Sequence, residues 1–148
     1  MELAHLVGKT SNPFIFQVDQ RHIRQFAQAI GDTNPLYIDE KYAKTTVHGG
    51  IIAPPTFPVA ISPDNGEQFD LGLDYRRMLH GEQQFIYTRA IRPGDVLHCQ
   101  LKVTDVYERE GKNGMMEFLV LDTEIVDTVG NHVVTSRMNI IYRSLVVK

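Results

Sequence analysis

The chain has 148 residues, of which 43% are hydrophobic and 22% charged, a composition typical of one folded globular domain and not of a disordered or collagen-like chain. Fifteen basic and eighteen acidic residues give a formal net charge of -3, and the basic residues are scattered, so a nucleic-acid partner is not expected. The single cysteine excludes an internal disulfide and fits a reducing compartment. We therefore expect one domain over residues 1–148.

The N-terminal residues do not resemble an export signal, because Glu2 and His5 interrupt any apolar run there. No other stretch approaches the roughly 20 apolar residues that span a bilayer. We expect no membrane span, no export and a cytoplasmic location.

A first amphipathic helix is predicted over residues 21–30, because apolar side chains recur there at the spacing of one helical face. These side chains are Ile23, Phe26, Ala27 and Ile30. Asp19 is placed to cap the start of the helix, and Gly31 is suited to the left-handed conformation that ends it.

A second short helix is predicted over residues 40–44, with Asp39 as its cap. Between the two helices, Pro35 keeps Asn34 out of the helical conformation, so residues 31–37 should form an ordered loop. A cluster of glycine and proline follows at residues 48–58.

A short apolar helix is predicted over residues 55–61, since proline suits the first turn of a helix. Residues 62–77 carry mixed signals and are expected to run over the surface.

From residue 79 onward the hydrophobic pattern has a period of two, which is typical of strands with one buried face. Strands are predicted over residues 81–90, 97–104, 115–126 and 132–143, with turns at residues 92–95, 111–114 and 129–131. They should form a meander of four long antiparallel strands, with a fifth strand near residues 14–18. Unpaired strand edges favour a dimer that continues the sheet.

Two loops contain several residues that are able to take part in catalysis or ligand binding. The first contains Asp32, Asn34 and Tyr37, and the second begins with His48, Gly49 and Gly50. Backbone N–H groups of adjacent glycines can approach a ligand closely, and they stabilise a developing oxyanion if they precede a helix.

Two sets of motifs resemble a known family. Residues 26–37 (FAQAIGDTNPLY), with Ala43 and residues 48–51 (HGGI), are similar to the hydratase motif of the MaoC-like, (R)-specific enoyl-CoA hydratases. Three further segments resemble the N-terminal-type MaoC dehydratase domain: residues 50–57 (GIIAPPTF), 79–83 (LHGEQ) and 92–95 (RPGD). The similarity runs from about residue 16 to residue 143.

The resemblance implies an α+β hot dog fold, in which a curved antiparallel sheet wraps around a central helix that includes residues 55–61. It implies association with an identical or a second hot dog subunit, and hydration or dehydration of an acyl thioester carried on coenzyme A or acyl carrier protein. No cofactor is implied.

The resemblance also indicates site residues. Asp32 matches the catalytic aspartate of the family, but Tyr37 stands where a histidine is expected five residues later. A phenol with a pKa near 10 rarely accepts a proton at pH 7, whereas imidazole does so readily. The candidate substrate-binding residues are Asn34, Gly49, Gly50 and Ile51.

Three mechanisms follow from this difference. Asp32 acts alone while Tyr37 orients water, or His48 contributes an imidazole, or the chain is a non-catalytic acyl-binding subunit whose partner carries the aspartate and histidine. A hot dog acyl-thioester hydrolase is a further alternative, since fold alone does not determine function.

Other kinds of site are not expected. The six histidines lack the close spacing of metal ligands, and neither a phosphate-binding glycine loop nor a nucleophile elbow is present. Arg76, Arg77 and Arg92 are candidates for contacts with coenzyme A phosphates.

Overall fold

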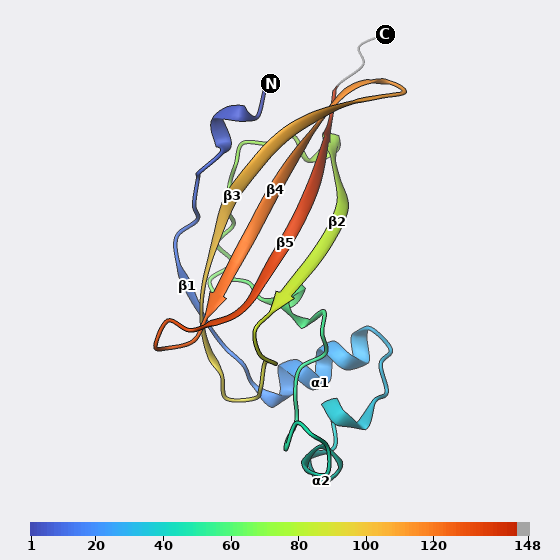
Figure 1. The fold of residues 1–148 in the computed structure, drawn as a ribbon, viewed down its shortest axis with the longest axis vertical. Coiled ribbons are helices and arrows are strands. Elements are labelled where there is room, and N and C mark those ends of the chain that lie inside the picture. Colours follow the sequence, from blue (N-terminus) through green and yellow to red (C-terminus); the bar gives the residue numbers. More distant parts are fainter. Residues whose placement is uncertain (145–148) are drawn as a thin grey trace.

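A five-stranded antiparallel sheet dominates the computed structural model, which describes residues 1–144 (Figure 1). The strand order is β1-β3-β4-β5-β2, and the long strands curve along their length. The strands are β1 (Phe14–Gln17), β2 (Met78–Tyr87), β3 (Val96–Gly111), β4 (Gly114–Val126) and β5 (His132–Arg143). This arrangement confirms the α+β hot dog class.

The α-helices lie together at one end of the sheet, where β1 leads into α1 (Figure 1). They are α1 (Gln20–Ala29) and α2 (Glu40–Lys44), and four 3-10 helices span Ala4–Leu6, Pro35–Tyr37, Phe57–Ala60 and Tyr75–Arg77. Both predicted N-caps are confirmed. The Asp19 carboxylate accepts a hydrogen bond from the Arg21 N–H at 2.8 Å, and the Asp39 carboxylate accepts one from the Tyr42 N–H at 3.1 Å.

The predicted meander of four strands is wrong in its order. β2 pairs with β5, from Met78 opposite Tyr142 to Tyr87 opposite Val134, and it does not neighbour β3. Residues 92–95 therefore turn the chain inside a crossover and do not close a hairpin. The Asp95 carboxylate accepts a hydrogen bond from the Arg92 N–H at 2.8 Å, which makes the turn tight without specifying which strands become neighbours.

The predicted helix at residues 55–61 is shorter than expected. Only Phe57–Ala60 is helical, as a 3-10 helix, because prolines at positions 55 and 58 have no N–H to donate.

Residues 62–77 do more than run over the surface. Phe69, Leu71 and Leu73 pack against a cluster of buried side chains on one face of the sheet. We call this the inner face; it carries Leu121 of β4 and Ile140 of β5. The segment therefore covers part of the sheet. From the sequence we expected the central helix to cover this face.

Two clusters of buried side chains form the core. The lower cluster surrounds α1 and includes Ile23, Tyr37, Ile51 and Cys99, which is 2% exposed as the sequence predicts. The upper cluster includes Leu3, Leu6, Val103, Leu119, Leu121 and Ile140. The loops that carry the candidate site residues are anchored on the lower cluster.

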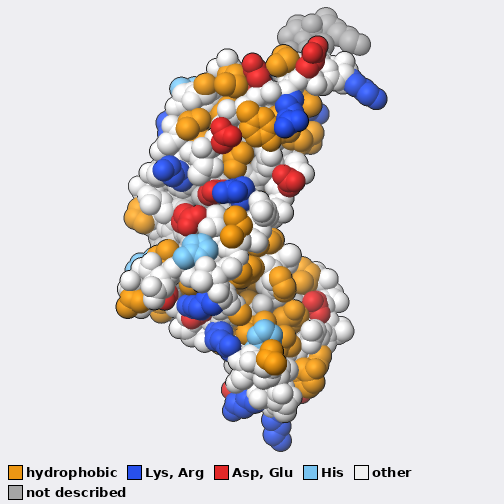
Figure 2. All heavy atoms as spheres, in the orientation of Figure 1, with side chains coloured by type: hydrophobic (Ala, Val, Ile, Leu, Met, Phe, Trp, Pro, Cys, Tyr) orange, Lys and Arg blue, Asp and Glu red, His pale blue; other side chains and the backbone are white. Residues whose placement is uncertain are grey.

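The surface is mixed in charge on the face drawn in Figure 2, where acidic and basic side chains alternate and apolar side chains lie between them. Among residues 1–144, no helix has the length and apolar character needed to cross a bilayer.

Candidate functional site

The Asp32 loop is held by its own side chains. Beyond α1, the Asp32 N–H donates to the Ala27 carbonyl at 2.9 Å, and Gly31 adopts a φ of 71° that ends the helix. The Asp32 Oδ1 accepts from the Asn34 N–H at 3.0 Å, and the Asn34 Oδ1 accepts from the Leu36 N–H at 3.0 Å. Within residues 1–144, the Asp32 Oδ2 accepts no hydrogen bond, so one oxygen of this half-buried carboxylate is available.

Tyr37 lies in the lower cluster and is 7% exposed. Burial raises the pKa of its phenol, and the charge of Asp32 raises it further. The two side chains are therefore close enough to interact, and the phenol stays neutral at physiological pH. Tyr37 can donate or accept a hydrogen bond, but it cannot replace a histidine as a proton acceptor.

The glycine loop follows α2 and does not begin a helix, so the condition for a helix N-terminus at this loop is not met. The Gly49 N–H donates to the Thr46 carbonyl at 3.1 Å, and Gly49 has a φ of 68°. The N–H groups of Gly50 and Ile51 donate to no other residue in the part of the chain that the structure describes. Ile51 is 5% exposed and shares the lower cluster with Tyr37.

Arg92 is brought next to the glycine loop. A backbone hydrogen bond from the Ala53 N–H to the Ile91 carbonyl, 2.8 Å long, ties the two segments together. A Cβ atom built on Gly50 would lie 3.7 Å from Arg92 Nη1. The other two arginines considered from the sequence form ion pairs far along the sheet, Arg76 with Asp74 and Arg77 with Glu2.

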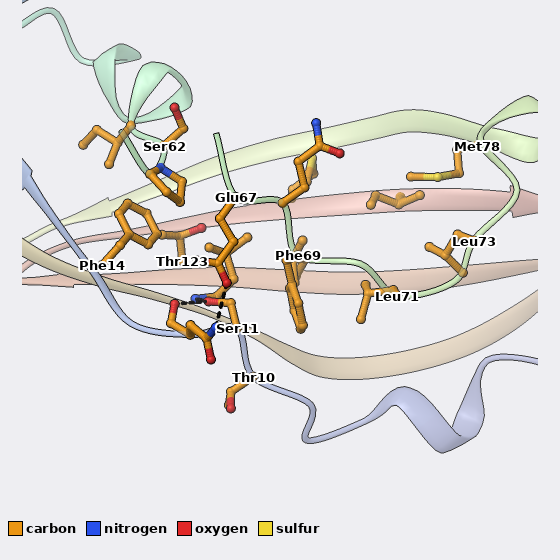
Figure 3. A pocket seen from close by; sticks show the side chains of 18 of the residues that line it. Thr10, Ser11, Phe14, Ser62, Glu67, Phe69, Leu71, Leu73, Met78 and Thr123 are labelled. Atoms are coloured by element: carbon orange, nitrogen blue, oxygen red, sulfur yellow. Dashed lines mark hydrogen bonds between the residues drawn. The ribbon is translucent and has the colours of Figure 1, made fainter. Parts of the chain in front are cut away.

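A large cavity lies between the inner face and residues 61–78, and sequence reasoning missed it (Figure 3). Its volume is about 580 Å³. Its apolar lining includes Phe69, Leu71, Leu73, Leu121, Met138 and Ile140. At its polar edge, Asn12 Nδ2 donates to Glu67 Oε1 at 2.6 Å. The alternation of apolar residues at 69, 71 and 73 was the available signal for a buried segment.

The predicted site residues do not line this cavity. Ile61 lines the cavity and belongs to the lower cluster, which also contains Tyr37 and Ile51.

The structure places the predicted site residues in two pairs, Asp32 near Tyr37 and Gly50 near Arg92. His48 is half-buried, and its backbone N–H donates to Thr46 Oγ1 at 3.2 Å. Residues 1–144 contain no group of three His, Cys, Asp or Glu side chains arranged to hold a metal.

Two solved structures have a similar fold. The MaoC-like dehydratase from Rhodospirillum rubrum aligns with a TM-score of 0.68 and 21% identity, covering 93% of each chain. The C-terminally truncated HadBC (3R-hydroxyacyl-ACP dehydratase) complex from Mycobacterium tuberculosis aligns with a TM-score of 0.72 and 21% identity, covering 92% of this chain and 96% of that one.

Sequence comparison gives the family. A protein of Thermobifida fusca named UPF0336 protein is 41% identical over 135 residues, which cover 88% of this chain and 86% of the relative. Residues 5–136 match the family described as FAS1-like, dehydratase domain region. The chain therefore belongs to the FAS1-like dehydratase domain family and has the hot dog fold of MaoC-like proteins.

Proposed function

We propose that this chain is one unit of a hydratase or dehydratase that acts on 2-enoyl and 3-hydroxyacyl thioesters, carried on coenzyme A or acyl carrier protein. Membership in a dehydratase family supports the type of reaction. The similarity to a chain of the HadBC complex supports assembly with a second hot dog subunit.

The observation that carries the proposal is the apolar cavity on the inner face. Its size of about 580 Å³ falls within the usual range for small-molecule sites. Leucine, methionine, isoleucine and phenylalanine side chains favour an acyl chain, since each buried CH₂ contributes about 0.8 kcal/mol. Ile61 lines this cavity and also belongs to the lower cluster, which contains Tyr37 and Ile51 of the two candidate loops.

The proton-transfer groups of this chain are incomplete. Asp32 offers one available carboxylate oxygen to a water molecule, and the neutral phenol of Tyr37 is suited to orienting that water. An imidazole is needed from elsewhere for efficient transfer near neutral pH. We assign that role to the second hot dog subunit, with His48 as the internal alternative.

Hydration of crotonyl-CoA by the purified chain, alone and with a candidate hot dog subunit, tests this proposal. Loss of the enoyl absorbance and release of free thiol are recorded together. We expect hydration that increases with the second subunit and no thiol release. Thiol release would instead identify a thioester hydrolase, and no turnover with any hot dog partner would leave only an acyl-binding role.

Asp32→Asn tests the carboxylate. The amide keeps an oxygen for the Asn34 N–H, so the loop should fold, while activity should fall at least about 100-fold because a general base is lost. Asp39→Asn is the matched control, since Asp39 makes the same kind of bond to a backbone N–H at the start of α2. Equal activity in the two variants would remove Asp32 from the mechanism.

A further inference from the structure

We infer that Gln83, Thr123 and Ser136 bind a hydroxyl group on the acyl chain of the ligand. This inference rests on the proposed function and narrows its substrates to acyl thioesters that carry a hydroxyl, either at C3 or farther along the chain. The three side chains lie on β2, β4 and β5, and none of them takes part in the proton transfer described above.

The three residues share the inner face of the sheet. Thr123 lines the cavity and lies directly opposite Ser136 in the pairing of β4 with β5, so both side chains point to the inner face. Gln83 lies opposite Met138, which also lines the cavity. Gln83 Nε2 donates to Ser136 Oγ at 3.0 Å, which joins the residues across the strands. We call these three residues the polar band.

The polar band separates the two clusters of the core. On the inner face of β4, Thr123 lies between Ile125 of the lower cluster and Leu121 of the upper cluster. Ser136 lies at the same level on β5. A hydroxyl among apolar neighbours favours the folded state less than a methyl group of the same shape would, unless it gains a hydrogen bond. Small numbers of polar groups in an apolar pocket typically orient a ligand.

The polar band has hydrogen-bonding capacity that the chain itself leaves unused. Within residues 1–144, the Thr123 hydroxyl has no hydrogen-bond partner and Gln83 Oε1 accepts no hydrogen bond. Ser136 is 8% exposed; it accepts from Gln83, and its own O–H has no acceptor in this part of the chain. Two hydroxyl donors and an amide acceptor suit a hydroxyl group, which both donates and accepts.

The rest of the cavity favours a neutral alkyl chain on the ligand. Leu71 and Leu73 of the covering segment face the upper cluster, beyond the polar band (Figure 3). Among the described residues that line the cavity, Glu67 alone is charged, and its carboxylate accepts a hydrogen bond from Asn12. A carboxylate at the edge disfavours an anionic ligand, so the polar group on the acyl chain should be uncharged.

Calorimetric titration of the full chain with decanoyl-CoA and four hydroxydecanoyl-CoA ligands tests the inference. The hydroxyl is placed at C3, C5, C7 or C9, so the series distinguishes a C3 hydroxyl from one farther along the chain. The enoyl absorbance is recorded to correct for dehydration of the C3 ligand. We expect one hydroxylated ligand to bind about tenfold more tightly than decanoyl-CoA, as for a net gain of one or two neutral hydrogen bonds.

Thr123→Val is the most direct variant, because valine keeps the shape of threonine and lacks the hydroxyl. Its melting temperature should not fall, since the Thr123 hydroxyl bonds to no other residue in 1–144. The preference for the hydroxylated ligand should disappear while the Kd of decanoyl-CoA stays the same. Gln83→Leu should reduce the preference in the same direction.

Thr104→Val is the matched control. Thr104 lies on β3, is exposed and does not line the cavity, and its hydroxyl donates to the Val120 carbonyl at 3.4 Å. The same chemical change at this position should leave the preference unchanged.

The possible outcomes distinguish the inference from the proposed function. Equal affinity of the unmodified chain for all five ligands would overturn the inference and leave acyl-thioester binding intact. A preference that survives both Thr123→Val and Gln83→Leu, or an equal loss of affinity for every ligand in these variants, would also overturn it. No binding of any of these thioesters by the unmodified chain would overturn the proposed function as well.

Discussion

At position 37, the side chain that replaces the expected histidine is a tyrosine packed into the core. It is 7% exposed, and burial raises the pKa of its phenol. A buried neutral phenol is a poor proton acceptor but a stable donor of hydrogen bonds. The residue thus keeps a polar group within range of the Asp32 charge without supplying a base.

Tyr37→Phe should change the rate of crotonyl-CoA hydration by less than about tenfold, since only a hydrogen bond to water is lost.

The free energy of unfolding should depend on pH through Tyr37 in a defined direction. The raised pKa favours folding below the unfolded tyrosine pKa near 10, and this contribution is lost as pH rises through the folded pKa. Urea unfolding at pH 8 and pH 11 should show a larger loss in the unmodified chain than in Tyr37→Phe. Equal losses would contradict this.

Cys99 should be unreactive in the folded chain. It is 2% exposed, and burial raises the pKa of its thiol to about 12, so little thiolate exists at pH 8. A thiol reagent added at pH 8 should react completely only after denaturation. Complete reaction within minutes under native conditions would disprove the assignment of Cys99 to the core.

At the scale of elements, local sequence signals predicted the positions of helices and strands well, but they did not predict which strands pair. Caps located α1 and α2 closely, because a cap depends only on residues within one turn. The alternation of apolar residues located β5 at residues 132–143. The position of β2 beside β5 was missed, since turn chemistry at residues 92–95 shows that the chain reverses but carries no information about a distant partner.

The candidate site, like the strands, was predictable in its local motifs but not in which distant segments lie together. Asp32 and Gly50 were named from motifs within a short stretch of sequence. The proximity of Gly50 to Arg92 was not predictable, because it depends on how residues 48–53 lie against the crossover. The cavity was missed because it requires residues 61–78 to fold back over strands that come later in the chain.

The pair between Asp122 of β4 and Arg137 of β5 gives a test of sheet stability. Arg137 Nε and Nη2 donate to the Asp122 carboxylate at 2.8 and 3.0 Å, and Asp122 is 5% exposed. Arg137→Gln leaves a buried carboxylate with a weaker partner. We expect the free energy of unfolding to fall by about 2 kcal/mol, less than for a fully buried pair because Arg137 is partly exposed.

Urea denaturation measures this loss, with Lys44→Gln as the control. Lys44 pairs with Glu40 at 3.8 Å on the exposed surface of α2, and its loss should cost less than about 0.5 kcal/mol. Addition of Asp122→Asn to Arg137→Gln should recover part of the stability, since no charge remains buried. Similar losses in Arg137→Gln and Lys44→Gln would show that burial adds nothing to the pair.

At the scale of the whole molecule, the cavity joins segments from both halves of the chain. The strands supply one wall, and residues 61–78 supply the other (Figure 3). The size of the cavity should therefore control which acyl chains bind.

Met138→Trp should select against long acyl chains, because the larger ring occupies space lined by Met138 on β5. We expect the affinity for dodecanoyl-CoA to fall at least about tenfold, while that for crotonyl-CoA changes less than threefold. Calorimetric titration measures both. Val129→Trp, at an exposed turn, is the control. Equal effects on both ligands would place the acyl chain outside the cavity.

The position of β2 beside β5 also has a consequence for how the chain folds. Both edge strands, β1 and β2, find their partners far along the chain, whereas β3, β4 and β5 follow one another through short turns. Closing long loops costs entropy before any contact forms, so proteins with such pairings fold in about milliseconds to seconds. The three central strands are thus expected to associate first, and the edges to dock last onto a preformed template.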